Sequence, residues 1–134
     1  MTLLVPNSGE NIALSYLIGK STTVRDLVYR FFATNITPSE TDVTGTYTEA
    51  TGGGYASKTL AGASWSVVNG APTAASFAQQ TWTFTGPLTT NPTIYGYYVT
   101  RNVDNDLVLA ETFTNFTPAN NGDQILLTPQ ITAD

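Results

Sequence analysis

Aromatic residues alternate with threonines between residues 80 and 101, and this stretch has the clearest pattern of apolar and polar positions in the chain. Trp82 and Phe84 share one side of the alternation, which breaks at GPLTTNP and resumes at TIYGYYVT. Alternation with a period of two is typical of a half-buried β-strand, and the prolines of the break suit a turn. The stretch therefore predicts two strands joined by a turn, with Trp82 and Phe84 in the core.

One segment near the start of the chain predicts a helix. Asn7 and Ser8 are favourable N-cap residues, and Gly19 is a favourable residue for ending the helix. Glu10 falls in the first turn, where the helix dipole favours an acid. The apolar residues cover most of the circumference, so we expect this helix to pack on a sheet or against another subunit. The segment lacks a basic start and an apolar run of about 18 residues, which predicts neither a signal peptide nor a membrane span.

The segment from residue 27 to residue 34 carries large apolar side chains on both faces of a predicted strand. Such a segment is typical of a central strand, or of a strand whose second face is hidden by a partner. One face has Leu27, Tyr29, Phe31 and Ala33, and the other has Val28, Arg30, Phe32 and Thr34.

Short strand-like runs separated by turn signals recur along the rest of the chain. They amount to about eight to ten strands with a turn every 8–12 residues or so, a spacing typical of antiparallel sandwiches and jelly rolls. We therefore predict one mainly β domain over residues 1–134, an antiparallel β-sandwich or jelly-roll-like fold with one short N-terminal helix. The residues expected to face inward are Leu27, Tyr29, Phe31, Trp65, Val67, Trp82, Phe84, Ile125 and Leu127.

Glycines mark two further local features. Gly96 lies between tyrosines in a predicted strand, which indicates a β-bulge or the close approach of another backbone. The triple glycine at residues 52–54 is explained by a flexible or positive-φ turn. A phosphate-binding loop is disfavoured, because it would need a lysine and a helix directly after the glycines.

Charged residues make up only 11% of the chain, against about a quarter in ordinary soluble domains. Two explanations stay open: much of the surface is shielded by a partner or works outside the crowded cytosol, or β-rich domains simply favour threonine. Ten acids against five bases give a net charge of −5. This balance predicts binding neither to nucleic acid nor to an anionic membrane.

The absence of histidine and cysteine excludes a histidine-based catalytic triad, a cysteine nucleophile and the common zinc sites. Glu49 and Glu111 sit at alternating positions of predicted strands, and a carboxylate pair is the remaining route to acid–base chemistry. Nothing in the sequence brings these two acids together. We therefore expect a protein without enzymatic activity, catalytic residues, cofactor or metal.

Two other groups of residues have both a functional and a structural explanation. The oxygen-rich segment from Asn102 to Asp106 has side chains that bind calcium, but a hairpin turn needs the same residues and is preferred. Tyr95, Tyr97 and Tyr98 would make a platform for a sugar ring, whereas packing in the core or against a subunit explains them with fewer assumptions.

A further likeness is carried by four stretches that together cover more than half of the chain, namely DLVYRFFATNITPSETD, YTEATGGGYASKTL, FTGPLTTNPTIYGYYVT and FTPANNGDQILLTPQIT. In these stretches the chain resembles small virion structural proteins of tailed bacteriophages, most of all head-decoration (cement) proteins of the cyanophage kind. The resemblance implies a β-rich domain that binds a viral shell, and it transfers no catalytic residue.

The function expected from the resemblance is that of a cement protein that stabilises a phage head by bridging capsid subunits. It would be made in the host cytoplasm and sit on the capsid surface of the virion, with the major capsid protein and copies of itself, as a dimer or trimer, for partners. The alternatives are a tail or neck component and a carbohydrate-binding β-sandwich module. The residues expected at a partner interface are Ile12, Tyr16, Val28, Arg30, Phe32, Tyr95 and Tyr97.

Overall fold

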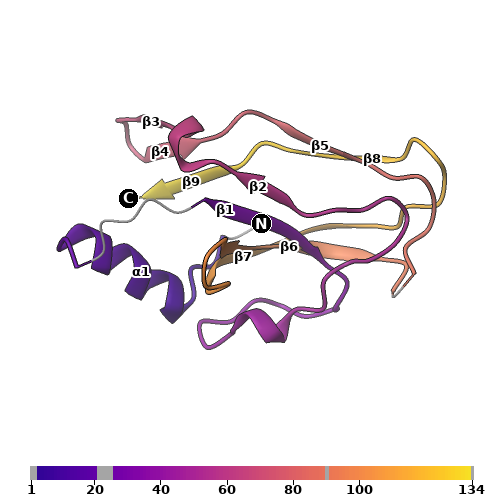
Figure 1. Cartoon of the computed structure of the whole chain (residues 1–134), viewed down its shortest axis with the longest axis horizontal. Helices are drawn as coiled ribbons and strands as arrows, with labels where there is room; N and C mark the ends of the chain where they lie inside the picture. Colours follow the sequence, from indigo (N-terminus) through magenta and orange to yellow (C-terminus); the bar gives the residue numbers. More distant parts are fainter. Residues whose placement is uncertain (1–2, 21–25, 90, 134) are drawn as a thin grey trace.

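The chain folds into two antiparallel β-layers with one helix at their side (Figure 1). The computed structural model describes residues 3–20, 26–89 and 91–133. The predicted mainly β fold, an antiparallel sandwich with a short N-terminal helix, is confirmed. In chain order the elements are α1 (Asn7–Leu17), β1 (Leu27–Phe32), η1 (Thr44–Thr46), β2 (Lys58–Leu60), η2 (Gly62–Ser64), β3 (Ser66–Val68), β4 (Thr73–Ser76), β5 (Gln80–Thr83), β6 (Ile94–Arg101), β7 (Leu107–Phe116), β8 (Gln124–Leu127) and β9 (Gln130–Ala133).

The first layer is a four-stranded sheet in the order β2-β1-β6-β7. The second layer is a long ribbon in which β4 and β5 run against β9 and β8, with β3 added at one end. Ser76 is opposite Gln130 and Gln80 is opposite Leu127, so three residues on one side face two on the other. This bulge contains Pro129, which has no N–H to donate and is tolerated at such irregularities.

The two strands predicted between residues 80 and 101 are both present, but they belong to different layers. β5 pairs with β8, whereas β6 pairs with β1 and β7. The predicted turn is therefore a crossing between the layers. It is held by a backbone bridge between Gly52 and Leu88 rather than by pairing of the two strands it joins.

The main core lies between the layers and contains four of the nine residues expected to face inward, and four more pack against it. Tyr29, Phe31, Trp82 and Phe84 are each at most 4% exposed. The expectation for Val67 is wrong, because this residue is 69% exposed. It lies on β3, an edge strand on which all three residues are exposed. The remaining residues expected inward, which are partly buried and pack against the core, are Leu27, Trp65, Ile125 and Leu127.

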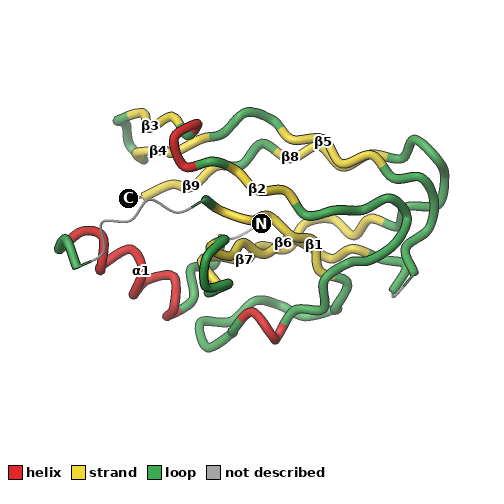
Figure 2. The backbone as a smooth tube through the Cα atoms, viewed as in Figure 1, coloured by secondary structure: helices red, strands yellow, loops and turns green. Residues whose placement is uncertain are grey.

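A second core covers the opposite face of the four-stranded sheet. Phe32 and Tyr98 point to this side and pack with Tyr47, which comes from the long segment between β1 and β2. Most of that segment is loop, and it runs beneath the sheet (Figure 2). β1 is thus a central strand, as one of the two sequence interpretations held, and its second face is covered by the chain itself.

The helix α1 begins one residue earlier than predicted and without the predicted cap. Pro6 occupies the N-cap position, and no side chain caps the helix. Ser8 Oγ instead donates a hydrogen bond to the Leu107 carbonyl at 2.8 Å, which ties the helix to β7. Gly19 follows the helix with a φ of 70°, in the left-handed region that ends many helices. No helix in the described part of the chain is long and apolar enough to span a membrane.

Candidate functional site

A groove follows the seam between β7 of the first layer and β8 and β9 of the second. It consists of two hollows, of about 360 and 380 Å³, that share Tyr97, Glu111 and Leu127. The walls of the first hollow include the aromatic and aliphatic side chains of Phe113, Phe116 and Ile125. The second continues past Leu127 towards β9. We call this feature the seam groove.

The polar centre of the seam groove is a hydrogen bond between the side chains of Tyr97 and Glu111. The two residues are opposite each other in the β6–β7 pair, and the Tyr97 hydroxyl donates to Glu111 Oε2. The Tyr97 ring stacks on Tyr29 with centroids 5.5 Å apart. Burial raises the pKa of Tyr97 well above its ordinary value, and the bond and charge of Glu111 raise it further. The hydroxyl therefore stays protonated, and remains a donor, at physiological pH.

Gly96 brings the backbones of β6 and β7 close together beside this pair. A Cβ atom at Gly96 would overlap the Glu111 carbonyl oxygen and lie 2.7 Å from Cζ of Phe32. The β6–β7 register shifts between Ile94 and Gly96. The bulge and the close backbone approach predicted for Gly96 are both confirmed.

Glu49, the other acid considered from the sequence, belongs to a different environment. Its carboxylate pairs with Arg30 Nη1 at 2.8 Å and accepts a hydrogen bond from the Tyr55 hydroxyl at 3.1 Å. The same hydroxyl accepts a hydrogen bond from the Phe31 amide. Glu49 is therefore linked through Tyr55 to the backbone of β1. These contacts use both carboxylate oxygens in structural bonds.

The structure does not bring Glu49 and Glu111 together as a catalytic pair. Glu49 is bridged to Phe32, Phe32 is opposite Gly96, and Gly96 is opposite Thr112, the neighbour of Glu111. Three strand spacings separate the two backbones by about 14 Å at about 4.8 Å per spacing. Carboxylate pairs in glycoside hydrolases lie about 5–9.5 Å apart.

The segment from Asn102 to Asp106 forms the tight turn between β6 and β7. Arg101 forms ion pairs with the two acidic side chains of this turn. The guanidinium lies 2.5 Å from Asp104 and 2.8 Å from Asp106. Asn105 has a φ of 60°, the left-handed conformation that such turns require. Among the described residues, no cluster of three or more acidic side chains is placed to hold a metal ion.

The glycines at residues 52–54 have positive φ angles of 83°, 56° and 76°. The positive-φ turn predicted for them is therefore confirmed. The Gly53 carbonyl accepts a hydrogen bond from the Thr85 amide at 2.8 Å, so the turn packs against the crossing between the layers.

The structure corrects part of the interface expected from the sequence. Val28, Phe32 and Tyr97 are at most 7% exposed, because both faces of β1 and β6 are covered within the chain. Tyr97 belongs to the main core and Phe32 to the second core. Arg30 is occupied by Glu49. Tyr95 is half-buried against the second core.

The tyrosine platform for a sugar is also corrected. Tyr97 and Tyr98 are adjacent in a strand, so their side chains enter opposite cores. Tyr98 stacks on Tyr47 at 5.1 Å. The three tyrosines of β6 therefore form no common exposed surface.

Ile12 and Tyr16 do border an open surface, at the end of the molecule where α1 and β3 lie (Figure 1). An apolar groove of about 330 Å³ runs between them and Trp65. Exposed aliphatic side chains lie at the same end of the molecule, at the end of α1 and on β3, which stand on either side of β9 in Figure 1. We call this surface the apolar end, and its exposed residues are Leu14, Leu17, Ile18, Val67 and Val68, at 59%, 81%, 73%, 69% and 64%.

Two features of these sites were missed from the sequence. The Tyr97–Glu111 pair could have been found from the predicted turn at residues 102–106, because the register of a hairpin follows from its turn. The exposure of β3 could not have been found in this way, because it depends on the position of the strand at the edge of its sheet. No protein-family model, curated protein or solved structure matches the chain.

Proposed function

We propose that this protein is a non-enzymatic structural protein that self-associates and binds other protein subunits through the apolar end. More specifically, the resemblance of its sequence to phage head-decoration proteins suggests a cement protein on the outside of a phage head. The observation that supports the proposal is the exposure of five aliphatic side chains at one end of the molecule, which are Leu14, Leu17 and Ile18 at the end of α1 and Val67 and Val68 on β3. Exposed apolar patches of this kind mark interaction sites between proteins.

The form of β3 suggests how two copies would meet. β3 is an edge strand, and its outer side has no partner strand among the described residues. An unpaired apolar edge is a template for pairing with another chain. Antiparallel pairing of β3 with β3 of a second copy satisfies two-fold symmetry, and α1 of each copy would extend the contact.

The rest of the fold suits a protein that holds neighbouring subunits together. Both faces of the first layer are covered by the chain's own segments, so this layer is packed on both sides. α1 has no basic residue in its last turn, and few charges need to lose water when the apolar end docks. Repeated by the symmetry of a shell, many modest contacts of this kind would have to break together before neighbouring capsid subunits separate.

Self-association is tested with variants that remove apolar side chains from the apolar end. We expect Leu17→Ser combined with Val67→Ser to shift the protein to monomer in light scattering. The matched control is Val43→Ser combined with Leu126→Ser, which removes a valine and a leucine that are 61% and 54% exposed elsewhere. Equal oligomeric states for the two double variants would contradict the role of the apolar end.

The location is tested on particles. Heads with the protein should resist heat and low ionic strength better than heads without it, and imaging should place it on the capsid surface. Equal resistance, or density only on the tail or neck, would overturn the cement assignment. The tail alternative would then be the better explanation.

A further inference from the structure

The first hollow of the seam groove lies along β7 and β8, away from β3, and the second reaches Thr132 of β9, which β4 separates from β3 (Figure 1). The proposed self-association uses the outer edge of β3 and does not involve the groove. Its centre is one carboxylate, Glu111, and the hollow on either side of it is partly apolar. We propose that the seam groove binds an extended peptide segment of a partner protein, with a lysine or arginine side chain against Glu111 and an apolar side chain in each hollow.

The charge of Glu111 is the first argument. Among the described residues no lysine or arginine pairs with it, whereas Glu49, Asp104 and Asp106 all have an arginine partner. Its Oε2 atom accepts a hydrogen bond from the Tyr97 hydroxyl. A half-buried carboxylate without a cationic partner is stabilised when a lysine or arginine of a bound ligand donates a hydrogen bond to it. The net charge of −5 of the protein adds a general attraction for a basic segment.

The open strand edges are the second argument. β7 is the last strand in its sheet, and among the described residues its outer edge is bridged only by Leu4 at Ala110. The part of β7 beyond Glu111 therefore lacks an outer neighbour. Among the strands that the structure describes, β8 pairs only with β5, so its other edge has no partner strand either. Unpaired backbone groups on both banks of a groove suit an added strand, a common mode of peptide recognition.

The spacing of the hollows is the third argument. In an extended peptide, side chains two positions apart point to the same side and lie about 6.6–7 Å from each other. A basic side chain that meets Glu111 therefore places its neighbours at two positions before and after in the hollows beside it. These hollows meet at Glu111 and Leu127, as such an arrangement requires.

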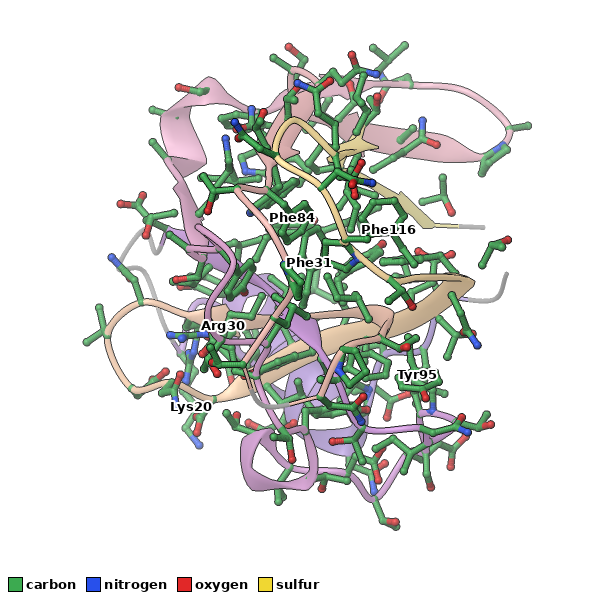
Figure 3. All side chains as sticks on the ribbon, turned by 90° about the vertical axis from the view of Figure 1, so that its right-hand side faces the viewer. Lys20, Arg30, Phe31, Phe84, Tyr95 and Phe116 are labelled. Carbon is green, nitrogen blue, oxygen red and sulfur yellow. The ribbon has the colours of Figure 1, made fainter. Side chains whose placement is uncertain are left out.

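A saccharide fits the seam groove less well. Sugar rings stack on free aromatic faces, but the ring of Phe113 packs edge-on against Phe31 with centroids 5.9 Å apart. The Phe116 ring packs tilted against the Phe84 ring with centroids 5.8 Å apart. Figure 3 labels Phe84 and Phe116 between the layers. The aromatic residues of the groove are engaged in the core and leave mainly their rims for a ligand.

The test is a display library of random nine-residue peptides, selected on the wild-type protein and on Glu111→Gln. Glutamine still accepts the Tyr97 hydrogen bond, so the variant removes the charge with little change of shape. Glu10→Gln is the matched control, since it removes one exposed acid from α1. We expect the wild type and Glu10→Gln to enrich peptides with a basic residue flanked two positions away by apolar residues. We expect affinity to fall about tenfold to hundredfold in Glu111→Gln.

A second readout is independent of the variant. The best peptide, added to the wild type, should slow amide hydrogen exchange in residues 112–116 of β7 or 124–127 of β8, and replacing its basic residue by glutamate should abolish binding. Failure to enrich any peptide, equal binding by Glu111→Gln, or protection elsewhere would each overturn the proposal. Saturable binding on a glycan array that is lost in Glu111→Gln, with no peptide enriched, would assign the groove to a saccharide instead. None of these results bears on the particle experiments above.

Discussion

The ring of Tyr47 lies flat on the ring of Tyr98, with centroids 5.1 Å apart and 13° between the planes. Tyr47 comes from the loop between β1 and β2, and Tyr98 from the centre of the sheet. This stack is the contact by which the long loop covers the second face of the sheet. The Tyr47 hydroxyl also donates to Asp42 at 2.8 Å, which holds the ring in place.

Tyr47→Ala should therefore lower the free energy of unfolding by about 3–5 kcal/mol, because it opens a cavity and removes a stacked ring. Val43→Ala, a change in the same loop at a residue that is 61% exposed, should change it by less than about 0.5 kcal/mol. Urea unfolding measures both. Similar small losses would mean that the loop does not contribute to the core.

Trp82→Ala should also cost about 3–5 kcal/mol. The indole lies 4.7 Å from the Phe31 ring and donates a hydrogen bond to the Ala56 carbonyl at 3.0 Å. Thr81→Ala, at the exposed neighbouring position, is the control and should be nearly neutral. A loss below about 1 kcal/mol for Trp82→Ala would show that the indole does not anchor the two layers.

Gly96→Ala is expected to destabilise the protein by about 1–3 kcal/mol or more, because the added methyl group meets the β7 backbone and the Phe32 ring. Gly45→Ala is the matched control, since a Cβ there has nothing within 4 Å. Thermal unfolding of the two variants compares them directly. Equal melting temperatures would contradict the close approach of β6 and β7.

Stability should fall at alkaline pH because of the buried tyrosines. Burial, with the charge of Glu49, raises the pKa of Tyr98 to about 12 and burial raises the pKa of Tyr29 and Tyr97 still further, while an unfolded tyrosine has a pKa of about 10. The folded state holds these protons more tightly. Their contribution is therefore complete below about pH 10 and is lost as the pH rises towards and through 12.

Urea midpoints between pH 8 and pH 12, read beside phenolate absorbance, measure this decline. Tyr98→Phe removes one of the titrating hydroxyls and should make the decline shallower. A midpoint that stays constant up to pH 12 would show that these phenols ionise equally in both states.

The local features of the chain could be predicted from its sequence because they depend on residues close together. Period-two alternation located β1, β5 and β6, and glycines located the turn at residues 52–54 and the bulge at Gly96. The helix was located within two residues at each end. Its cap was not, because Ser8 is drawn to the Leu107 carbonyl, which is 99 positions away in the chain.

What covers each face was decided only by the tertiary structure. Alternation predicts that Phe32 and Val67 each share a strand face with the residues two positions away. It does not predict which part of the chain packs against that face. Phe32 is buried because a distant loop supplies Tyr47, whereas Val67 is exposed because β3 is an edge strand. The candidate sites depend on the same kind of information. The apolar end and the seam groove exist where two elements far apart in the sequence leave an apolar surface or a strand edge without cover.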